Sequence, residues 1–183
     1  MRQIIKEFAA EIAEGEIEIY NEFSLQHEFG IYLRSKFPNM KIQFERPVSF
    51  FFSRTNLNFI KREIDISVFS QDKTNKEAAF ELKFPRNGQY PEQMFSFCKD
   101  ICFIEQLKQA GFKATYFIVF ADDRLFYEGS SEGIYGFFRG KKDLRGTIQK
   151  PTGKKDETVK ISGKYTIVWH TVTKEIKYGF VET

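Results

Sequence analysis

The chain contains little of what marks several common kinds of functional site. Among its 183 residues there are only two cysteines, Cys98 and Cys102, and two histidines, His27 and His170. The cysteines lie four positions apart in an expected helix and form no CxxC motif. We therefore expect small buried thiols rather than a disulfide framework or a zinc site. No GxxxxGK[ST] or GxGxxG segment occurs, so nucleotide-driven chemistry is not indicated.

Long apolar runs are also missing. No stretch approaches the roughly 18 consecutive apolar residues of a membrane helix, and the first residues lack the features of a secretory signal. We therefore expect a cytoplasmic protein without a membrane partner. The composition, 42% hydrophobic and 29% charged, is typical of a globular protein, and the length suits one domain over residues 1–183. The 22 phenylalanines predict a core built around phenyl rings.

The net charge of +3 is small, but basic residues gather in one segment. Residues 139–155 hold seven of them and a single acid, with three glycines and one proline interspersed. This composition predicts a mobile basic loop over about 139–158 that grips nucleic-acid phosphates and supplies affinity rather than base reading. A solvated surface loop is the alternative. The basic residues are Arg139, Lys141, Lys142, Arg145, Lys150, Lys154 and Lys155.

Hydrophobic periodicity predicts an α/β fold with a mixed central sheet flanked by helices. A strand before the third helix and a buried strand after it form a βαβ unit with a parallel crossover. The tail predicts a C-terminal β-hairpin over about 159–182, in which residues 159–169 pair with residues 175–181. The expected helices span 2–14, about 21–36 and about 91–111, and the other expected strands span 41–53, 61–69, 78–84 and 114–121.

Two of the expected strands bring acids together with a lysine. Asp65 lies in the strand 61–69, and Glu81 and Lys83 lie in the strand 78–84. Side chains on a strand alternate between faces, so Ile64, Ile66 and Val68 share one face and Asp65 the other, while Glu81 and Lys83 share a face of their strand. Two carboxylates are ligands that Mg²⁺ prefers, and a nearby lysine can stabilise charge on a phosphate. Charge pairs on an exposed strand are the alternative.

The same residues resemble a known nuclease motif. Ile64-Asp65, followed about fifteen residues later by Glu81-Leu82-Lys83 and then by a long helix, is similar to the PD-(D/E)XK nuclease superfamily. The resemblance covers a core of about residues 20–122, and Ile64 stands where the family name has proline. It implies a restriction-endonuclease-like fold and a metal-dependent nuclease, most simply an endodeoxyribonuclease.

The resemblance also implies roles for individual residues. Mg²⁺, with Mn²⁺ as a substitute, would be held by Asp65, Glu81, the backbone carbonyl of Leu82 and an acid from the preceding helix. That acid is expected to be Glu28, or Glu22 if the helix register differs. Lys83 would orient or deprotonate the attacking water, and Gln93, early in the following helix, is an accessory candidate. If a strand were shifted, Glu63 or Glu77 could replace a core acid.

Nucleic acid, expected to be DNA, is the implied partner, and a homodimer is the implied assembly. Two alternatives stay open from the sequence. One is an RNA-cleaving nuclease with the same site, and the other is a non-catalytic binding or regulatory protein that keeps the fold.

Overall fold

The computed structural model describes residues 1–52, 58–86, 88–153 and 156–183. Lys154 and Lys155 of the expected basic loop lie outside the described residues. The helices are α1 (Arg2–Glu14), α2 (Glu22–Lys36), α3 (Tyr90–Ala110) and the short α4 (Tyr135–Phe138), with 3₁₀ turns η1 (Val48–Phe50) and η2 (Arg124–Phe126). The strands are β1 (Lys41–Pro47), β2 (Glu63–Phe69), β3 (Lys76–Lys83), β4 (Ala114–Ala121), β5 (Leu144–Gln149), β6 (Thr158–Tyr165), β7 (His170–Thr171) and β8 (Lys177–Glu182).

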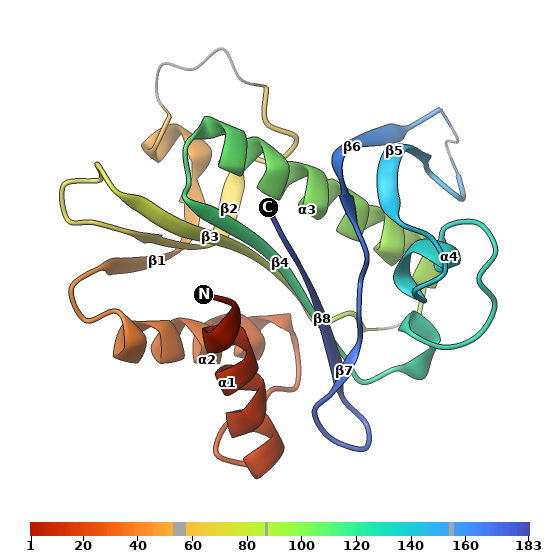
Figure 1. Ribbon diagram of the computed structural model, residues 1–183, viewed down its shortest axis with the longest axis horizontal. Coiled ribbons are helices and arrows are strands. Elements are labelled where there is room, and N and C mark those ends of the chain that lie inside the picture. Colours follow the sequence, from red (N-terminus) through yellow and green to blue (C-terminus); the bar gives the residue numbers. More distant parts are fainter. Residues whose placement is uncertain (53–57, 87, 154–155) are drawn as a thin grey trace.

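Six strands form a mixed sheet in the order β1-β2-β3-β4-β8-β7 (Figure 1). The β3–β4 pair is parallel, as the crossover through α3 requires, and the other pairs in this sheet are antiparallel. The predicted α/β architecture with a mixed central sheet flanked by helices is therefore confirmed.

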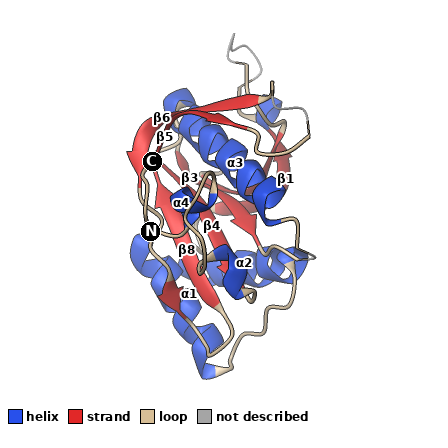
Figure 2. Cartoon of the chain, turned by 90° about the vertical axis from the view of Figure 1, so that its right-hand side faces the viewer, coloured by secondary structure: helices blue, strands red, loops and turns tan. Residues whose placement is uncertain are grey.

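The two faces of the sheet carry different cores. Helices α1 and α2 cover one face, where Phe8 and Phe29 pack against Phe80 and Phe120 of the sheet. Helix α3 covers the other face, and the two-stranded sheet β5–β6 packs against α3 (Figure 2). This second sheet explains why α3 is apolar on most sides, since it is buried between two layers.

The limits of α3 follow from its sequence. Pro91 occupies the first turn, where a missing backbone N–H costs nothing, and Gly111 ends the helix in a left-handed conformation with φ of 116°. Gly15 ends α1 in the same way, at the end expected for the helix 2–14. Both free cysteines lie on α3; Cys98 is buried and Cys102 half-buried.

Three expectations about the strands were wrong. The strand expected over 41–53 ends at Pro47, where η1 begins. The expected loop over 139–158 contains β5, which pairs with β6. The expected C-terminal hairpin between residues 159–169 and 175–181 does not form as such. Strand β6 pairs with β5, and β8 pairs with β4 and, in a short hairpin, with the two-residue β7. No described helix is long and apolar enough to cross a membrane.

Candidate functional site: a buried cluster of carboxylates and lysines

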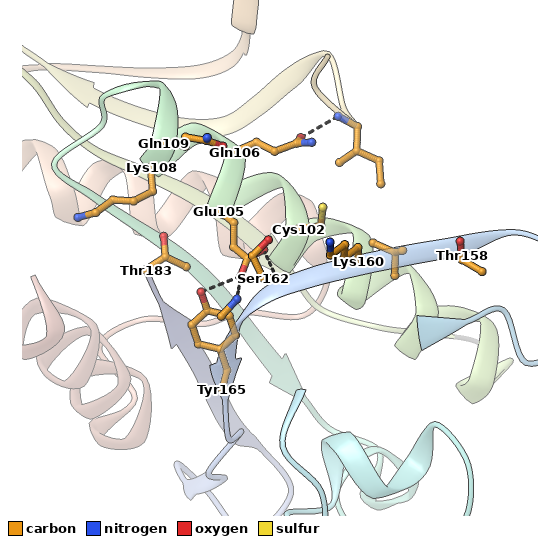
Figure 3. A pocket seen from close by; sticks show the side chains of 13 residues that line it. Cys102, Glu105, Gln106, Lys108, Gln109, Thr158, Lys160, Ser162, Tyr165 and Thr183 are labelled. Atoms are coloured by element: carbon orange, nitrogen blue, oxygen red, sulfur yellow. Dashed lines mark hydrogen bonds between the residues drawn. The ribbon is translucent and has the colours of Figure 1, made fainter. Parts of the chain in front are cut away.

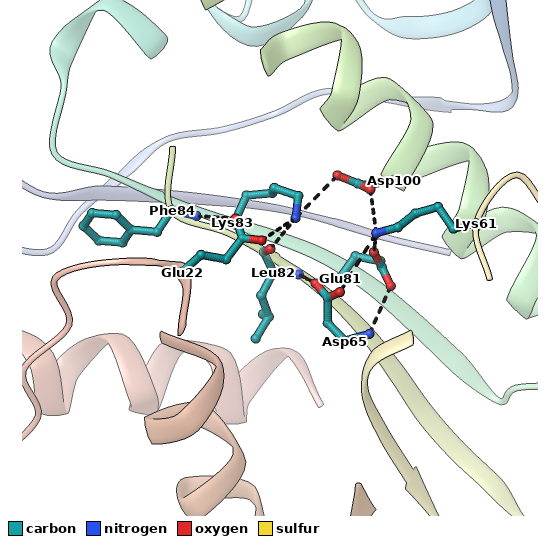
Figure 4. Close-up of polar contacts among 8 residues, drawn as sticks. All are labelled: Glu22, Lys61, Asp65, Glu81, Leu82, Lys83, Phe84 and Asp100. Atoms are coloured by element: carbon teal, nitrogen blue, oxygen red, sulfur yellow. Dashed lines mark hydrogen bonds and ion pairs between the residues drawn. The ribbon is translucent and has the colours of Figure 1, made fainter. Parts of the chain in front are cut away.

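Asp65 and Glu81 meet where β2 and β3 separate (Figure 4). The regular pairing of the two strands reaches Ile66 opposite Phe80. Beyond that point the Asp65 side chain takes over the role of a backbone acceptor: its Oδ2 accepts a hydrogen bond from the Leu82 N–H at 2.8 Å. The Asp65 N–H in turn lies 3.3 Å from Glu81 Oε1. Glu81 thus accepts from the backbone of Asp65, and Asp65 accepts from the residue after Glu81.

This local separation changes the predicted faces of β2. Ile66 and Val68 pack in the core beneath α1 and α2, as the alternation predicts. Ile64 instead packs in the cluster that contains Phe103 and Leu107 of α3. The predicted common face of Ile64, Ile66 and Val68 is therefore wrong for Ile64.

A third carboxylate and a second lysine complete the cluster. Asp100 enters from α3, and Lys61 from the segment just before β2. The Lys61 ammonium forms ion pairs with Glu81 Oε2, with Asp100 Oδ1 at 2.9 Å and with Asp65 Oδ1 at 3.9 Å. Its Nζ lies among all three acids, as Figure 4 shows.

Lys83 lies on the other side of the same acids. Its Nζ donates to the Leu82 carbonyl at 3.0 Å and to Glu22 Oε1 at 2.8 Å, and it lies 4.0 Å from Asp100 Oδ2. Glu22, in the first turn of α2, also approaches the Phe84 N–H at 3.5 Å. The helix before the sheet therefore does contribute an acid to the cluster.

Three of the four acids are almost fully removed from water, whereas the side chain of Glu22 is 40% exposed. The exposed fraction is 0% for Glu81, 2% for Asp100 and 6% for Asp65. Burial raises the pKa of Glu81 well above its usual range, and the charge of Asp65 adds to this effect. Burial likewise raises the pKa of Asp100, although Lys83 and Lys61 oppose the rise.

The pKa of each lysine is also raised, but here burial opposes the rise and the neighbouring acids cause it. Burial alone would lower the pKa of Lys61, but the charges of Glu81 and Asp100 outweigh it and raise the pKa. Burial would also lower the pKa of Lys83, but nearby acids, chiefly Asp100, outweigh this effect and raise it. Both amines are therefore charged at neutral pH.

The donor set suits a hard divalent cation. Four carboxylates, those of Glu22, Asp65, Glu81 and Asp100, face two ammonium groups, so the ionised cluster carries an excess of two negative charges. In addition, Asp100 Oδ2 is buried and has no hydrogen-bond partner among the described residues. A buried carboxylate oxygen that accepts no hydrogen bond in a negative cluster is a fitting ligand for Mg²⁺. As arranged with Lys61 inside, however, no group of three His, Cys, Asp or Glu among the described residues has the geometry of a metal site.

Two of the predicted site residues lie outside this cluster. Glu28 is partly exposed, and its recorded ion pair is with the neighbouring His27 at 3.5 Å; Glu22, the alternative acid, is the one that reaches Lys83. Gln93 uses its side-chain amide to donate to the carbonyls of Arg86 and Gly88. It therefore holds the turn before α3 rather than contacting the acids.

The sequence contained signals for Glu22, which was expected only as the alternative to Glu28, and for Asp100, which was not assigned to the site. Glu22 precedes Leu25 by three residues and Phe29 by seven, which places it in line with the buried stripe of α2. Asp100 lies between Phe97 and Ile104 at helical spacing, so it is an acid on a buried helix face. Lys61 opened the expected strand 61–69, four residues before Asp65 and so on the same face, but in the structure it lies just before β2 in a segment without regular structure.

Of the seven basic residues expected to contact nucleic acid, the five that the structure describes fall into two groups. Lys141, Lys142 and Arg145 are exposed and could meet a phosphate backbone. Arg139 instead donates to the carbonyls of Ser130 and Leu125 and stacks on a tyrosine ring, and Lys150 pairs with Glu157 at 3.2 Å. The latter two are engaged within the protein.

Another hollow lies away from the cluster. A groove of about 740 Å³ lies between α3 and β6 (Figure 3), where Glu105 accepts hydrogen bonds from the Ser162 and Gly163 amides and from the Tyr165 hydroxyl. The Glu105 carboxylate therefore already has hydrogen-bond donors within the protein, and we interpret the groove as a structural contact between the β5–β6 sheet and α3. A smaller hollow of about 430 Å³ lies at Lys61, with Phe59 and Glu63 in its wall.

No protein-family model, curated protein or solved structure matches this chain. The chemistry of the cluster is therefore inferred from its own residues.

Proposed function

We propose that this chain is a metal-dependent phosphodiesterase, specifically an endodeoxyribonuclease of the PD-(D/E)XK type with a restriction-endonuclease-like core. The observation that supports the proposal most strongly is the meeting of Asp65, Glu81 and Asp100 in one buried cluster beside Lys83. Burying several like charges is costly, and their excess over the two lysines leaves the cluster suited to a further cation.

Each residue has a part in this proposal. Asp65 and Glu81 would hold Mg²⁺, with Asp100 and the Leu82 carbonyl as further oxygen donors. The metal would supply positive charge against the phosphate oxygens. Lys83, whose ammonium is fixed by Glu22 and the Leu82 carbonyl, would orient the attacking water and offset charge on the phosphate. Water bonds to phosphorus while the bond to the leaving sugar oxygen breaks.

A second candidate is a non-catalytic protein that keeps this fold. It is favoured by the position of Lys61, because that ammonium partly compensates the three acids without any metal. Metal binding distinguishes the two candidates in a simple measurement, because only the phosphodiesterase requires divalent cations to bind at Asp65 and Glu81.

The test is cleavage of three substrates: supercoiled plasmid, single-stranded DNA and structured RNA. Each is incubated with the protein in Mg²⁺, Mn²⁺ or EDTA, beside Lys83→Met and the matched control Lys113→Met. Lys113 pairs with Glu77 at 3.0 Å and is largely exposed, outside the cluster. We expect metal-dependent cleavage of DNA that falls at least a hundredfold in Lys83→Met and is unchanged in Lys113→Met.

The outcomes separate the candidates. Cleavage of RNA alone would keep the chemistry and change the substrate. Absence of both cleavage and Mn²⁺ binding would refute the phosphodiesterase and favour the non-catalytic protein.

A further inference from the structure

The most unusual contact in the cluster is that of Lys61, which lies where a metal ion would have to bind. Its ammonium contacts Glu81 and Asp100 and lies within 3.9 Å of Asp65. These are the three acids whose oxygens would coordinate a divalent cation in the proposed function. A metal ion and the Lys61 ammonium cannot occupy this space together.

Lys83 has a different relation to the acids. It lies 4.0 Å from Asp100 and makes its closest contacts to Glu22 and a backbone carbonyl. It can therefore keep its position when the space among the acids is filled. Lys61 is the cation that must leave.

The surroundings of Lys61 allow it to leave. Its side chain is 29% exposed, against 15% for Lys83, so it forms the more open side of the cluster. Lys61 also lines the hollow of about 430 Å³ together with Phe59 and Glu63. The flexible four-carbon stem of a lysine can swing its ammonium into such a space.

We propose that Lys61 is a built-in cation that closes the carboxylate site and that a divalent metal must displace to bind. This competition between Lys61 and the metal would regulate metal binding, and the inference rests on the proposed metal-dependent function. Lys61 stabilises the metal-free protein by compensating the acids, and the same contact weakens the affinity for metal. The site would then be loaded only when the metal concentration is high enough to compete with an internal charge.

The first measurement is Mn²⁺ binding by calorimetry to wild type, Lys61→Met, Lys61→Arg and the control Lys113→Met. Lys61→Met keeps the length of the stem without its charge. We expect it to bind Mn²⁺ at least about tenfold more tightly than wild type, because the competing cation is gone. Lys61→Arg, which keeps the charge, should bind no more tightly than wild type, and Lys113→Met should match wild type.

A second measurement uses only the wild-type protein, in case Lys61→Met does not fold. Lysine acetylation is followed by mass spectrometry with and without Mn²⁺. Displacement predicts that acetylation of Lys61 increases at least about threefold with Mn²⁺, while acetylation of Lys113 does not change.

The outcomes distinguish this inference from the proposed function. If wild type binds Mn²⁺ but Lys61→Met binds it equally or more weakly, and metal does not expose Lys61, the displacement is wrong and the metal site stands. If neither wild type nor Lys61→Met binds Mn²⁺, both the metal site and the displacement are wrong. Tighter binding by Lys61→Met supports the displacement.

Discussion

Asp100→Asn tests whether the buried cluster carries more negative charge than it can compensate. At an effective dielectric constant of about 20, the ammonium groups of Lys61 at 2.9 Å and Lys83 at 4.0 Å attract the Asp100 carboxylate by about 6 and 4 kcal/mol. Two effects oppose this attraction. Desolvation of a fully buried charge costs several kcal/mol, and two neighbouring acids repel the Asp100 carboxylate. The raised pKa of Asp100 means that the opposing terms win.

We therefore expect Asp100→Asn to stabilise the metal-free protein at pH 7. Replacing a whole buried ion pair by packed apolar residues can add about 1–4 kcal/mol, whereas removing one partner of a balanced pair costs about 3–5 kcal/mol. After Asp100→Asn, the acids Glu22, Asp65 and Glu81 still outnumber the two lysines that they contact. No ammonium is left uncompensated, so we expect a gain of only about 1–2 kcal/mol. For a chain of this size each kcal/mol raises Tm by about 2–4 °C. The rise in Tm should be roughly 2–8 °C in EDTA.

The pH dependence has a definite sign. The folded-state pKa of Asp100 lies above the unfolded value of 3.8, so ionisation of this group costs stability as pH rises from 3.8 through the folded pKa. Below 3.8 the carboxyl is protonated in both states. The advantage of Asp100→Asn should therefore vanish in acid and grow toward neutral pH.

The assay is thermal unfolding followed by circular dichroism from pH 3.5 to pH 8, in EDTA and in Mn²⁺. Asp143→Asn is the matched control, since Asp143 bonds to Thr166 and Lys164 at the surface and its pKa is lowered. It should lose a little stability at neutral pH instead of gaining. In saturating Mn²⁺, wild type should instead be more stable than Asp100→Asn. Metal at a hundred times its Kd adds about 2.7 kcal/mol to the free energy of unfolding of wild type, and it adds less to a variant with a weaker site.

One result would refute the reasoning. If Asp100→Asn loses more than about 1 kcal/mol in EDTA at pH 7, the lysines need the Asp100 charge and the cluster is a balanced structural network.

Three further predictions concern other parts of the molecule. Gly30→Ala should destabilise the protein by about 1–3 kcal/mol in chemical unfolding, because a Cβ at Gly30 would overlap the Phe44 ring; Gly30→Ala combined with Phe44→Leu should recover part of the loss, and an unchanged midpoint would contradict this packing. Glu22→Gln should lower nuclease activity at least tenfold while Glu28→Gln leaves it near wild type, and the reverse order would restore the assignment made from sequence. Glu105→Ala should speed hydrogen exchange of the β6 amides about tenfold or more, since it removes three hydrogen bonds, and equal exchange would show that the apolar contacts of β6 suffice.

Local pattern was enough to predict the central elements. The sequence predicted the strands β2 and β3 from their alternation, and it predicted the long apolar helix α3 and the buried strand β4. The parallel crossover followed from the order of these elements. The bounds of α1 and α2 were also close to those observed. The helices α1 and α2 carry a periodic signal because each is buried on one face, whereas α3 and β4 are recognised as nearly continuous apolar runs of helix and strand length.

The pairing of the later strands was not readable from local pattern. In β5 the buried residues Leu144 and Ile148 are four apart, and a register shift after Leu144 breaks the alternation, so the segment looked like a basic loop. In β6 the alternation of Val159 and Ile161 was visible, but a periodic strand does not indicate its partner.

The site was predictable in its core and not at its margins. Asp65, Glu81 and Lys83 converge as the strand pairing implies, although Asp65 is held by the Leu82 N–H in a way that alternation does not describe. Asp100 and Lys61 reach the cluster through tertiary packing, from a helix and from an irregular segment. Their roles depend on distances that no single stretch of sequence encodes.

The pairing of β8 with β4 has a consequence for how the molecule folds. Val181 lies opposite Phe117, so this pairing closes a long loop and costs more chain entropy than the pairings of neighbouring strands. The β1–β2–β3 meander and the β3–α3–β4 unit need much shorter closures, and they contain Asp65, Glu81 and Asp100. We expect the acids to be brought together in the early nucleus, with the last strand docking afterwards. Substitutions that relieve their repulsion should therefore act mainly on the folding rate, and substitutions in β8 mainly on the unfolding rate.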